Sequence, residues 1–124
     1  MDMGIDDNFR VGANIYGGIP DPGYYSVMLG TWGKTYLNAA ICNVLCFDAK
    51  DEKVQTGSAL WDSNSDGNER PVRQTFKRPF TKTPDVVVFI TSFDSNNDRF
   101  VRIDVAASEI DKNGFTVNMR TWDG

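Results

Sequence analysis

The chain has 124 residues, 40% of them hydrophobic, so it has the length of one domain and enough apolar side chains for a modest core. Its formal net charge of −4 argues against a nucleic-acid partner, because binding phosphates requires a basic face. The chain has no histidine, which excludes Ser-His-Asp and Cys-His catalysis and removes the commonest zinc ligand, so we expect no metal site.

The composition favours an all-β fold. Eleven glycines, five prolines and many short alternating runs are typical of a β-sandwich, and no long stretch has a helical period. No apolar run is long enough to span a bilayer, and residues 1–4 do not resemble a signal peptide. We therefore expect a soluble protein with no membrane span, either cytoplasmic or non-classically secreted.

The first predicted element is a β-hairpin over residues 9–32. Arg10 opens a run of alternating apolar residues, and Thr31-Trp32 closes a second run. The segment Pro20-Asp21-Pro22-Gly23 is typical of a turn, and a bulge or longer loop is expected near Gly17-Gly18.

A dense apolar run, Tyr36–Phe47, follows the first hairpin. Both of its faces are apolar, which indicates a central or doubly covered strand, with a buried helix as the competing interpretation. Cys42 and Cys46 would then have Cα atoms about 13 Å apart, too far for a disulfide. We expect buried free thiols and a reducing compartment. The charged break at 48–53 predicts a linker, centred on residues 51–53.

Three further strands are predicted after the linker, at Val54–Trp61, Val72–Phe76 and Val86–Phe93. The loops that separate or follow them are rich in turn formers: Asp62–Glu69, Pro79–Pro84 and Asp94–Arg99. The first and last of these loops are rich in oxygen ligands, but neither has the spacing of a calcium loop, so plain turns are favoured. Five basic residues are expected to blunt a solvated strand edge: Arg70, Arg73, Lys77, Arg78 and Lys82.

Residues 100–122 repeat the outline of residues 9–32. An Arg again opens an alternating run, a Gly-aromatic pair follows a turn, and Thr-Trp closes the segment, so a second half-buried hairpin is predicted. Val101, Ile103 and Val105 alternate with polar residues before the turn, as do Phe115, Val117 and Met119 after it. In the turn, Asp111–Gly114, we expect Asn113 and Gly114 to supply the positive φ of a tight hairpin.

The two copies are out of phase. The first copy continues into a long apolar run and has little before its Arg, whereas the second is preceded by several strands and ends after its Trp. The predicted organisation is therefore the C-terminal half of one repeat at 1–50, a linker at 51–53, and a domain at 54–124 that lacks its last strand.

The order of these motifs resembles the H-type lectin domain of snail agglutinins and of the C-terminal part of discoidins. The pattern runs from Val54-Gln55-Thr56-Gly57 through Arg102-Ile103 and Gly114-Phe115 to Thr121-Trp122. The resemblance implies a six-stranded antiparallel β-sandwich that assembles as a trimer or hexamer and binds galactose or N-acetylgalactosamine between subunits. We expect no cofactor and no enzymatic activity: an enzyme such as a glycosidase would need two carboxylates across a cleft, and although acidic residues are plentiful, nothing in the sequence places two of them so.

The resemblance also implies a set of carbohydrate-binding residues. The Arg of the family falls on Arg102 and Arg10, and the Asn two positions earlier falls on Asn8 but on Phe100 in the second copy. The Trp of the family falls on Trp122 and Trp32, and the polar position after it falls on Asp123 and Gly33. The Gly and Asp of the early loop fall on Gly67 and Asp66, and the Tyr of the last strand falls near Asn38 or Tyr36.

These residue types suit a hexose. A carboxylate accepts hydrogen bonds from vicinal hydroxyls, a guanidinium donates them, and an indole packs on the apolar C–H face of galactose. Each contact is weak, so an oligomer would gain affinity from several sites. Other interpretations stay open: Arg102 could pair with Asp104 or Asp98, the tryptophans could be packing residues, and the chain could be a structural or adhesion repeat with a decayed sugar site.

The missing last strand leads to a prediction about assembly. Tyr36–Phe47 is expected to supply the sixth strand to the sheet of residues 54–124, either within one chain, as in a circular permutant, or between chains by exchange. Exchange between chains would close a ring or build a polymer.

Overall fold

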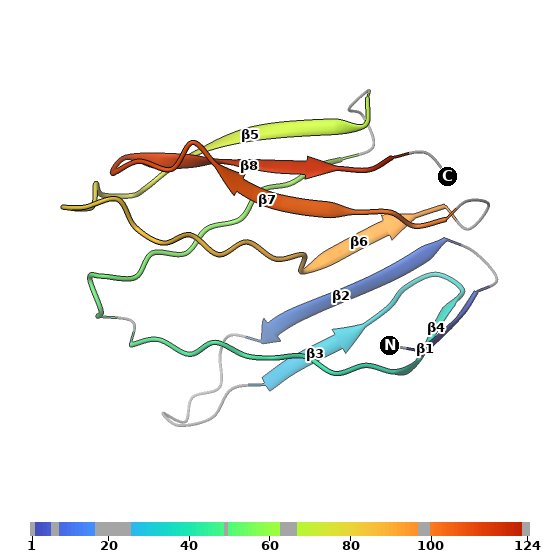
Figure 1. The fold of residues 1–124 in the computed structure, drawn as a ribbon. Coiled ribbons are helices and arrows are strands. Elements are labelled where there is room, and N and C mark those ends of the chain that lie inside the picture. The colour runs from blue at the N-terminus through green and yellow to red at the C-terminus, as the bar shows by residue number, and fades with distance from the viewer. Residues whose placement is uncertain are drawn as a thin grey trace. The chain divides into compact units, whose positions relative to one another are not determined.

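The computed structural model describes residues 2–5, 8–16, 26–48, 50–62, 67–96 and 100–122. In these ranges the chain forms β-strands and no helix, and every strand pairing is antiparallel (Figure 1). The strands are β1 (Asp2–Ile5), β2 (Phe9–Tyr16), β3 (Ser26–Gly30), β4 (Thr35–Ala39), β5 (Glu69–Thr75), β6 (Ser92–Ser95), β7 (Asp104–Ser108) and β8 (Gly114–Arg120). The all-β fold class is confirmed and is consistent with a β-sandwich.

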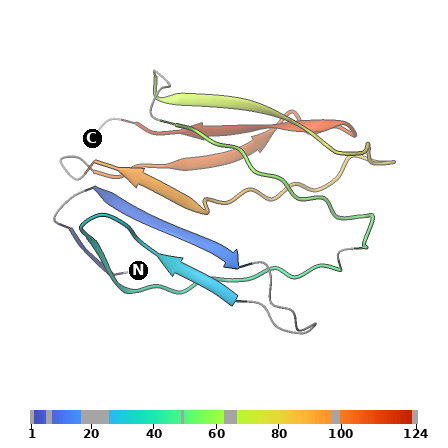
Figure 2. The same ribbon diagram turned by 180° about the vertical axis from the view of Figure 1, so that it is seen from behind.

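The chain divides into two compact units. Unit 1 comprises residues 1–44 and 90–101, and unit 2 comprises residues 45–89 and 102–124. Unit 1 therefore combines the first predicted hairpin with a strand from far along the chain, β6, whose ribbon lies beside β2 in both views (Figures 1 and 2). The predicted division at residues 51–53 into parts of two out-of-phase repeats stays a prediction.

In unit 1 the predicted hairpin over residues 9–32 is confirmed. β2 pairs with β3 from Gly12↔Gly30 to Tyr16↔Ser26. The other edge of β2 pairs with β6, from Phe9↔Ser95 to Gly12↔Ser92, which gives the strand order β3-β2-β6. The predicted turn Pro20–Gly23 and the bulge at Gly17-Gly18 lie outside the described residues.

The predicted strand Tyr36–Phe47 is too long. The structure has only β4 at this place, and β4 pairs with β1, from Ile5↔Thr35 to Asp2↔Ala39, instead of joining the sheet of residues 54–124. Among the described residues this ladder extends as far as Ala39. Beyond it Ile41 is 96% exposed, so this segment is not the doubly covered strand that its apolar pattern indicated. Supply of this strand to another chain stays a prediction.

The cysteines at the end of this segment are free, but only one of them is partly buried. Cys42 is half-buried and Cys46 is exposed. The expectation of two buried thiols is therefore wrong for Cys46, because the segment that carries it has no covering layer on that face among the described residues.

Unit 2 is a three-stranded sheet with the order β5-β8-β7. The second predicted hairpin is confirmed, since β7 pairs with β8 from Asp104↔Arg120 to Ser108↔Thr116. The predicted strand at 72–76 is confirmed as β5, which pairs with the other edge of β8.

Two other predicted strands are wrong in extent. Residues 54–61 form no strand, and only the last two residues of Val86–Phe93 belong to one, β6. In the first segment a side chain binds the backbone where a neighbouring strand would pair: the Gln55 amide donates to the Arg78 carbonyl at 2.7 Å and accepts from the Arg78 N–H at 3.3 Å. β-propensity therefore predicts which segments are extended, but it does not specify the strand with which each segment pairs.

The core of unit 2 gathers on β8. Val117 is 8% exposed, and its neighbour Thr116 is buried as well, so both faces of β8 are covered. Phe76 packs edge-to-face on Phe80 with ring centroids 4.9 Å apart, and lies 5.5 Å from the ring of Phe115. Backbone N–H groups of Phe76 and Phe80 donate to carbonyls of the β7–β8 turn, which fixes this aromatic cluster against the hairpin.

The β7–β8 turn is held by a carboxylate. Asp111 accepts hydrogen bonds from the N–H groups of Asn113 and Gly114, at 2.6 and 2.9 Å, and from the guanidinium of Arg73 at 3.0 Å. The left-handed residue is Glu109, with φ of 50°, and neither Asn113 nor Gly114 has positive φ. The expectation for these two residues is wrong because the Asp111 side chain satisfies their N–H groups in ordinary backbone conformations.

Because of these contacts, acid is expected to weaken the turn. The hydrogen bond from the Asn113 N–H, followed by those from Gly114 and the charge of Arg73, holds the pKa of Asp111 below its ordinary value of 3.8. A carboxyl with a lowered folded pKa stabilises the fold above its unfolded pKa, and this contribution is lost as the pH falls through the folded value.

Asp111→Asn is therefore expected to lower the urea midpoint at neutral pH and to lose part of the pH dependence on the acid side. The measurement is the urea midpoint of both proteins between about pH 6 and about pH 2. Parallel curves across this range would contradict the role given to Asp111.

Candidate functional site

The strongest polar cluster of unit 1 joins β2 to β6. Arg10 stands opposite Asp94 in the strand register, and its Nε donates to Asp94 Oδ2 at 3.0 Å. Asn8 donates from Nδ2 to the other oxygen, Asp94 Oδ1, also at 3.0 Å. We call these three residues the Arg10 cluster. The side chain of Arg10 is only 16% exposed, so this ion pair is better shielded from water than an ordinary surface pair.

The local sequence explains this arrangement. Asn8 and Arg10 are two residues apart in extended backbone, so their side chains lie on one face. Thr35 binds the carbonyl of Asn8 through its hydroxyl, and Thr31 donates to the carbonyl of Arg10 at 2.6 Å. Both backbone positions that carry the polar side chains are thus anchored by threonine hydroxyls.

Trp32 lies close to the same place. A Cβ built on Gly12 would be 3.7 Å from Cζ3 of the indole, so the ring packs against the bare backbone of Gly12. Gly12 pairs with Gly30, and continuing this register by two residues places Trp32 opposite Arg10. Trp32 is 44% exposed and can therefore offer part of its ring to a ligand.

The hairpin of unit 2 has the same register relation. Asp104 pairs with Arg120, and continuing by two residues places Arg102 opposite Trp122. Arg102 is half-buried and its Nη1 atom is shielded from solvent, whereas Trp122 is half-exposed. The repeat in the sequence therefore corresponds to two antiparallel hairpins in which, if the register continues past the paired residues, one Arg faces one Trp.

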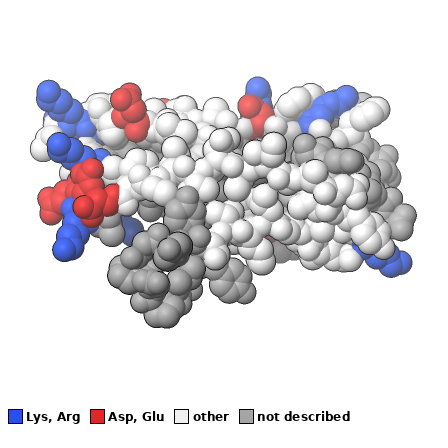
Figure 3. Space-filling model, turned by 90° about the horizontal axis from the view of Figure 1, so that it is seen from below, with Lys and Arg blue, Asp and Glu red and all other residues white. Residues whose placement is uncertain are grey.

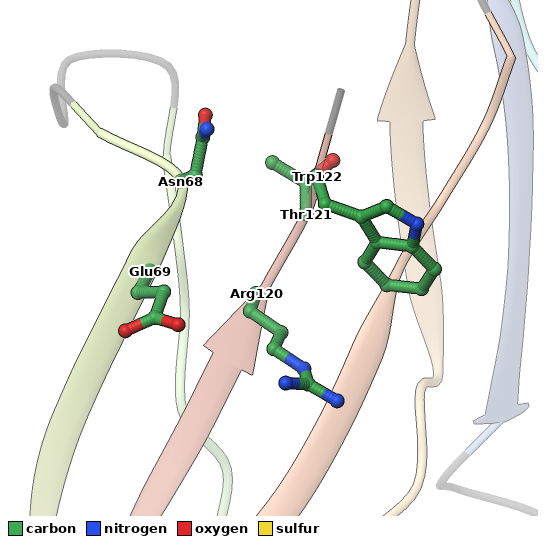
Figure 4. A pocket seen from close by; sticks show the side chains of 5 residues that line it. All are labelled: Asn68, Glu69, Arg120, Thr121 and Trp122. Carbon is green, nitrogen blue, oxygen red and sulfur yellow. The ribbon is translucent and has the colours of Figure 1, made fainter. Parts of the chain in front are cut away.

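In unit 2 a second arginine lies beside the indole. Arg120 donates from Nε to Asp104 Oδ2 at 2.8 Å, and its guanidinium carbon lies 5.9 Å from the centre of the Trp122 ring. Figure 4 shows the guanidinium and the indole on one side of β8, with Glu69 and Asn68 on the β5 side. Asp104, considered from sequence as a partner of Arg102, is bound by Arg120.

An open hollow of about 430 Å³ occupies this end of the sheet. Its lining consists of Asn68, Glu69, Arg120, Thr121 and Trp122 (Figure 4). Of these five residues, only Trp122 was among the predicted carbohydrate-binding residues. The signal for Arg120 was its place two residues before Trp122, which puts both side chains on one face of the strand.

The other predicted site residues are dispersed. Gly67 is exposed, has φ of 101°, and directly precedes Asn68 of the hollow. Gly33 is in the turn between β3 and β4 with φ of 69°, and Asn38 and Tyr36 are exposed on β4. Asp66 and Asp123 lie outside the described residues. The role of these residues in binding stays a prediction.

Charge is mixed on the surface. In Figure 3 the largest group of charged side chains combines Lys and Arg with Asp and Glu. Two of the predicted basic-edge residues are in ion pairs, Arg73 with Asp111 at 3.0 Å and Arg78 with Glu52 at 3.6 Å. Within the described ranges no cluster of three acidic or thiol side chains is placed to hold a metal, and no helix is long and apolar enough to cross a membrane.

Guanidinium, carboxylate and indole groups, as found in both units, are chemically suited to a ligand that carries hydroxyl groups. Residues 71–124 match the H-type lectin domain, which confirms the predicted resemblance over this part of the chain. The match supports carbohydrate binding in general, and the family is a non-enzymatic one.

One curated relative gives further similarity. The chain is 33% identical over 66 residues to a protein called "ATP synthase subunits region ORF 7" of Fuscovulum blasticum, over 53% of this chain. The aligned part spans 56% of that relative, so the chain covers about half of its length. No solved structure matches the chain.

Proposed function

We propose that the protein is a lectin for terminal galactose or N-acetylgalactosamine. The observation that carries this proposal is the Arg10 cluster beside Trp32, in which a guanidinium, a carboxylate and an amide lie next to a half-exposed indole. The family match at 71–124 supports a carbohydrate as the ligand class.

The chemistry of the Arg10 cluster fits a galactoside. A guanidinium presents N–H donors in one fixed plane, and the Nε–H of Arg10 donates to Asp94. Charge-assisted hydrogen bonds from Arg10 and to Asp94 suit adjacent hydroxyls that donate and accept together. The exposed part of Trp32 provides an apolar surface for the C–H face of the sugar.

Two sites per chain would make the protein multivalent. Arg102 and Trp122 lie two residues beyond the Asp104↔Arg120 pair, as Arg10 and Trp32 lie two residues beyond Gly12↔Gly30, and we assign them, with Gly67 and Asp66, to a second galactoside site. Assembly as a trimer or hexamer would multiply the sites, and affinity for clustered glycans would rise by effective concentration.

A structural or adhesion repeat with a decayed sugar site is the second candidate for unit 2. The observation that favours it is the residue two positions before the Arg. This residue is Asn8 in unit 1, but it is Phe100 before Arg102, and Phe100 is 79% exposed. A phenyl ring cannot replace the hydrogen bonds of an amide.

Glycan-array binding tests the proposal. The intact protein is expected to bind galactose- or N-acetylgalactosamine-terminated glycans, to be displaced by free galactose, and to lose part of this binding in Arg102→Ala. Binding that no galactoside inhibits would overturn the lectin function. Full retention in Arg102→Ala would favour a decayed site in unit 2.

A further inference from the structure

The two hairpins differ at the pair of residues next to the Arg and the Trp. In unit 1 this pair is Gly12 and Gly30, whereas in unit 2 it is Asp104 and Arg120. The hairpin of unit 1 forms with glycines at this place, whereas that of unit 2 carries a charged pair. An exposed ion pair of this kind adds little stability.

The ion pair fixes the guanidinium on the wall of the hollow. Asp104 holds Arg120 by Nε at 2.8 Å, and the Trp122 ring lies 5.9 Å from the guanidinium carbon. Thr121 donates its N–H to the Asn68 carbonyl at 2.8 Å, which joins the end of β8 to the chain entering β5. The hollow is thus lined by groups whose positions are set by the sheet.

The size and charge of the hollow restrict its ligand. Its volume of about 430 Å³ is within the roughly 300–1,000 Å³ of small-molecule sites. Among the lining residues Glu69 carries one negative charge and Arg120 one positive charge, so the lining has no net charge and favours a neutral ligand. Carboxylate, amide and hydroxyl groups beside an indole suit a neutral ring with several hydroxyls.

We propose that this hollow is a second sugar subsite of unit 2, which takes the neutral pyranose ring linked to the terminal galactoside. This inference rests on the proposed function. The Trp122 indole lies at the end of β8, the middle strand, with Arg102 on the β7 side by register and with Asn68 and Glu69 on the β5 side (Figure 4). A disaccharide can therefore place one ring on each flank of this strand end.

The test compares a monosaccharide with a disaccharide by isothermal titration. Methyl galactoside and lactose are titrated into the wild-type protein, Glu69→Gln and Asn68→Ala, with Glu52→Gln as the control. Glu52 is an exposed glutamate of unit 2 that pairs with Arg78. Wild type is expected to bind lactose about tenfold more tightly than methyl galactoside, because a hydrogen bond to a charged group contributes that much.

Glu69→Gln is expected to reduce this ratio several-fold, Asn68→Ala to reduce it as well, and Glu52→Gln to preserve it. If wild type binds both sugars with equal affinity, or if both lining variants keep the ratio of wild type, the second subsite is wrong while the lectin function stands. If wild type binds neither sugar, the proposed function fails and the subsite fails with it.

Discussion

Replacing Arg10 by alanine is expected to weaken galactoside binding at the unit 1 site by about ten- to a hundredfold, since hydrogen bonds from charged groups contribute about 1.5–3 kcal/mol. The variant also leaves the Asp94 carboxylate without the guanidinium that now binds its Oδ2 atom at 3.0 Å. In this variant Asn8 remains the donor to Asp94 Oδ1, and Oδ2 loses its charged partner. Titration with methyl galactoside measures the loss of affinity. Both proteins in the comparison carry Arg102→Ala, so that the proposed site of unit 2 does not contribute to the measured binding.

The structure offers a matched control. Arg73→Ala removes another ion pair of 3.0 Å, with Asp111, at the β7–β8 turn. It is expected to leave the affinity unchanged while lowering stability slightly. Asp94→Asn is expected to weaken binding as Arg10→Ala does, because the two Asp94 oxygens accept hydrogen bonds from Asn8 and Arg10 and so hold both donors in place. Equal affinities for wild type and Arg10→Ala would remove Arg10 from the site.

The fold was predictable where the pairing is local. Both hairpins join strands that follow one another in the chain, and alternation with a turn signal is enough to find such pairs. The β2–β6 pairing was not predictable, because it joins residues 84 apart, Arg10 and Asp94, and no local pattern specifies such a partner. The same limit explains Val54–Trp61, whose composition suits a strand but which has no ladder in the structure.

The candidate site, like the fold, was predictable only where its residues are close in the sequence. Arg10, Asn8 and Trp32 were found from sequence because they belong to one hairpin or directly precede it. Asp94 was interpreted as a turn residue within Asp94–Arg99, and only its register with Arg10 shows that it is the acid of the cluster. A carboxylate from the loop at 62–68 was expected in this role.

Arg120 was missed for a different reason. Its spacing from Trp122 is local, and the pairing with Asp104 follows from the hairpin register, so the information was present in the sequence. The resemblance directed attention to Arg102 instead. The strand register of the hairpin places Arg120 on the same face as Trp122, so assigning this register from the sequence is enough to identify Arg120 as a candidate.

Gly114→Ala is expected to destabilise unit 2 by about 1–3 kcal/mol, the usual cost of forcing atoms into a packed site. Gly114 is buried at the start of β8, and a Cβ there would overlap the carbonyl oxygen of Gln74 and lie 3.2 Å from the carbonyl carbon of Gln74 and from Cα of Thr75. These are backbone atoms of the paired strand β5, which cannot move without opening the β5–β8 ladder.

Gly57→Ala provides the comparison, because a Cβ at Gly57 meets no atom within 4 Å. At such a position alanine changes stability by about 1 kcal/mol at most, and in the stabilising direction if the backbone conformation suits it. Urea unfolding of the two variants against wild type measures the difference. A Gly114→Ala midpoint equal to that of Gly57→Ala would mean that β5 can withdraw from β8 at little cost, and then Asn68 and Glu69, which enter β5, could not be fixed parts of a binding surface.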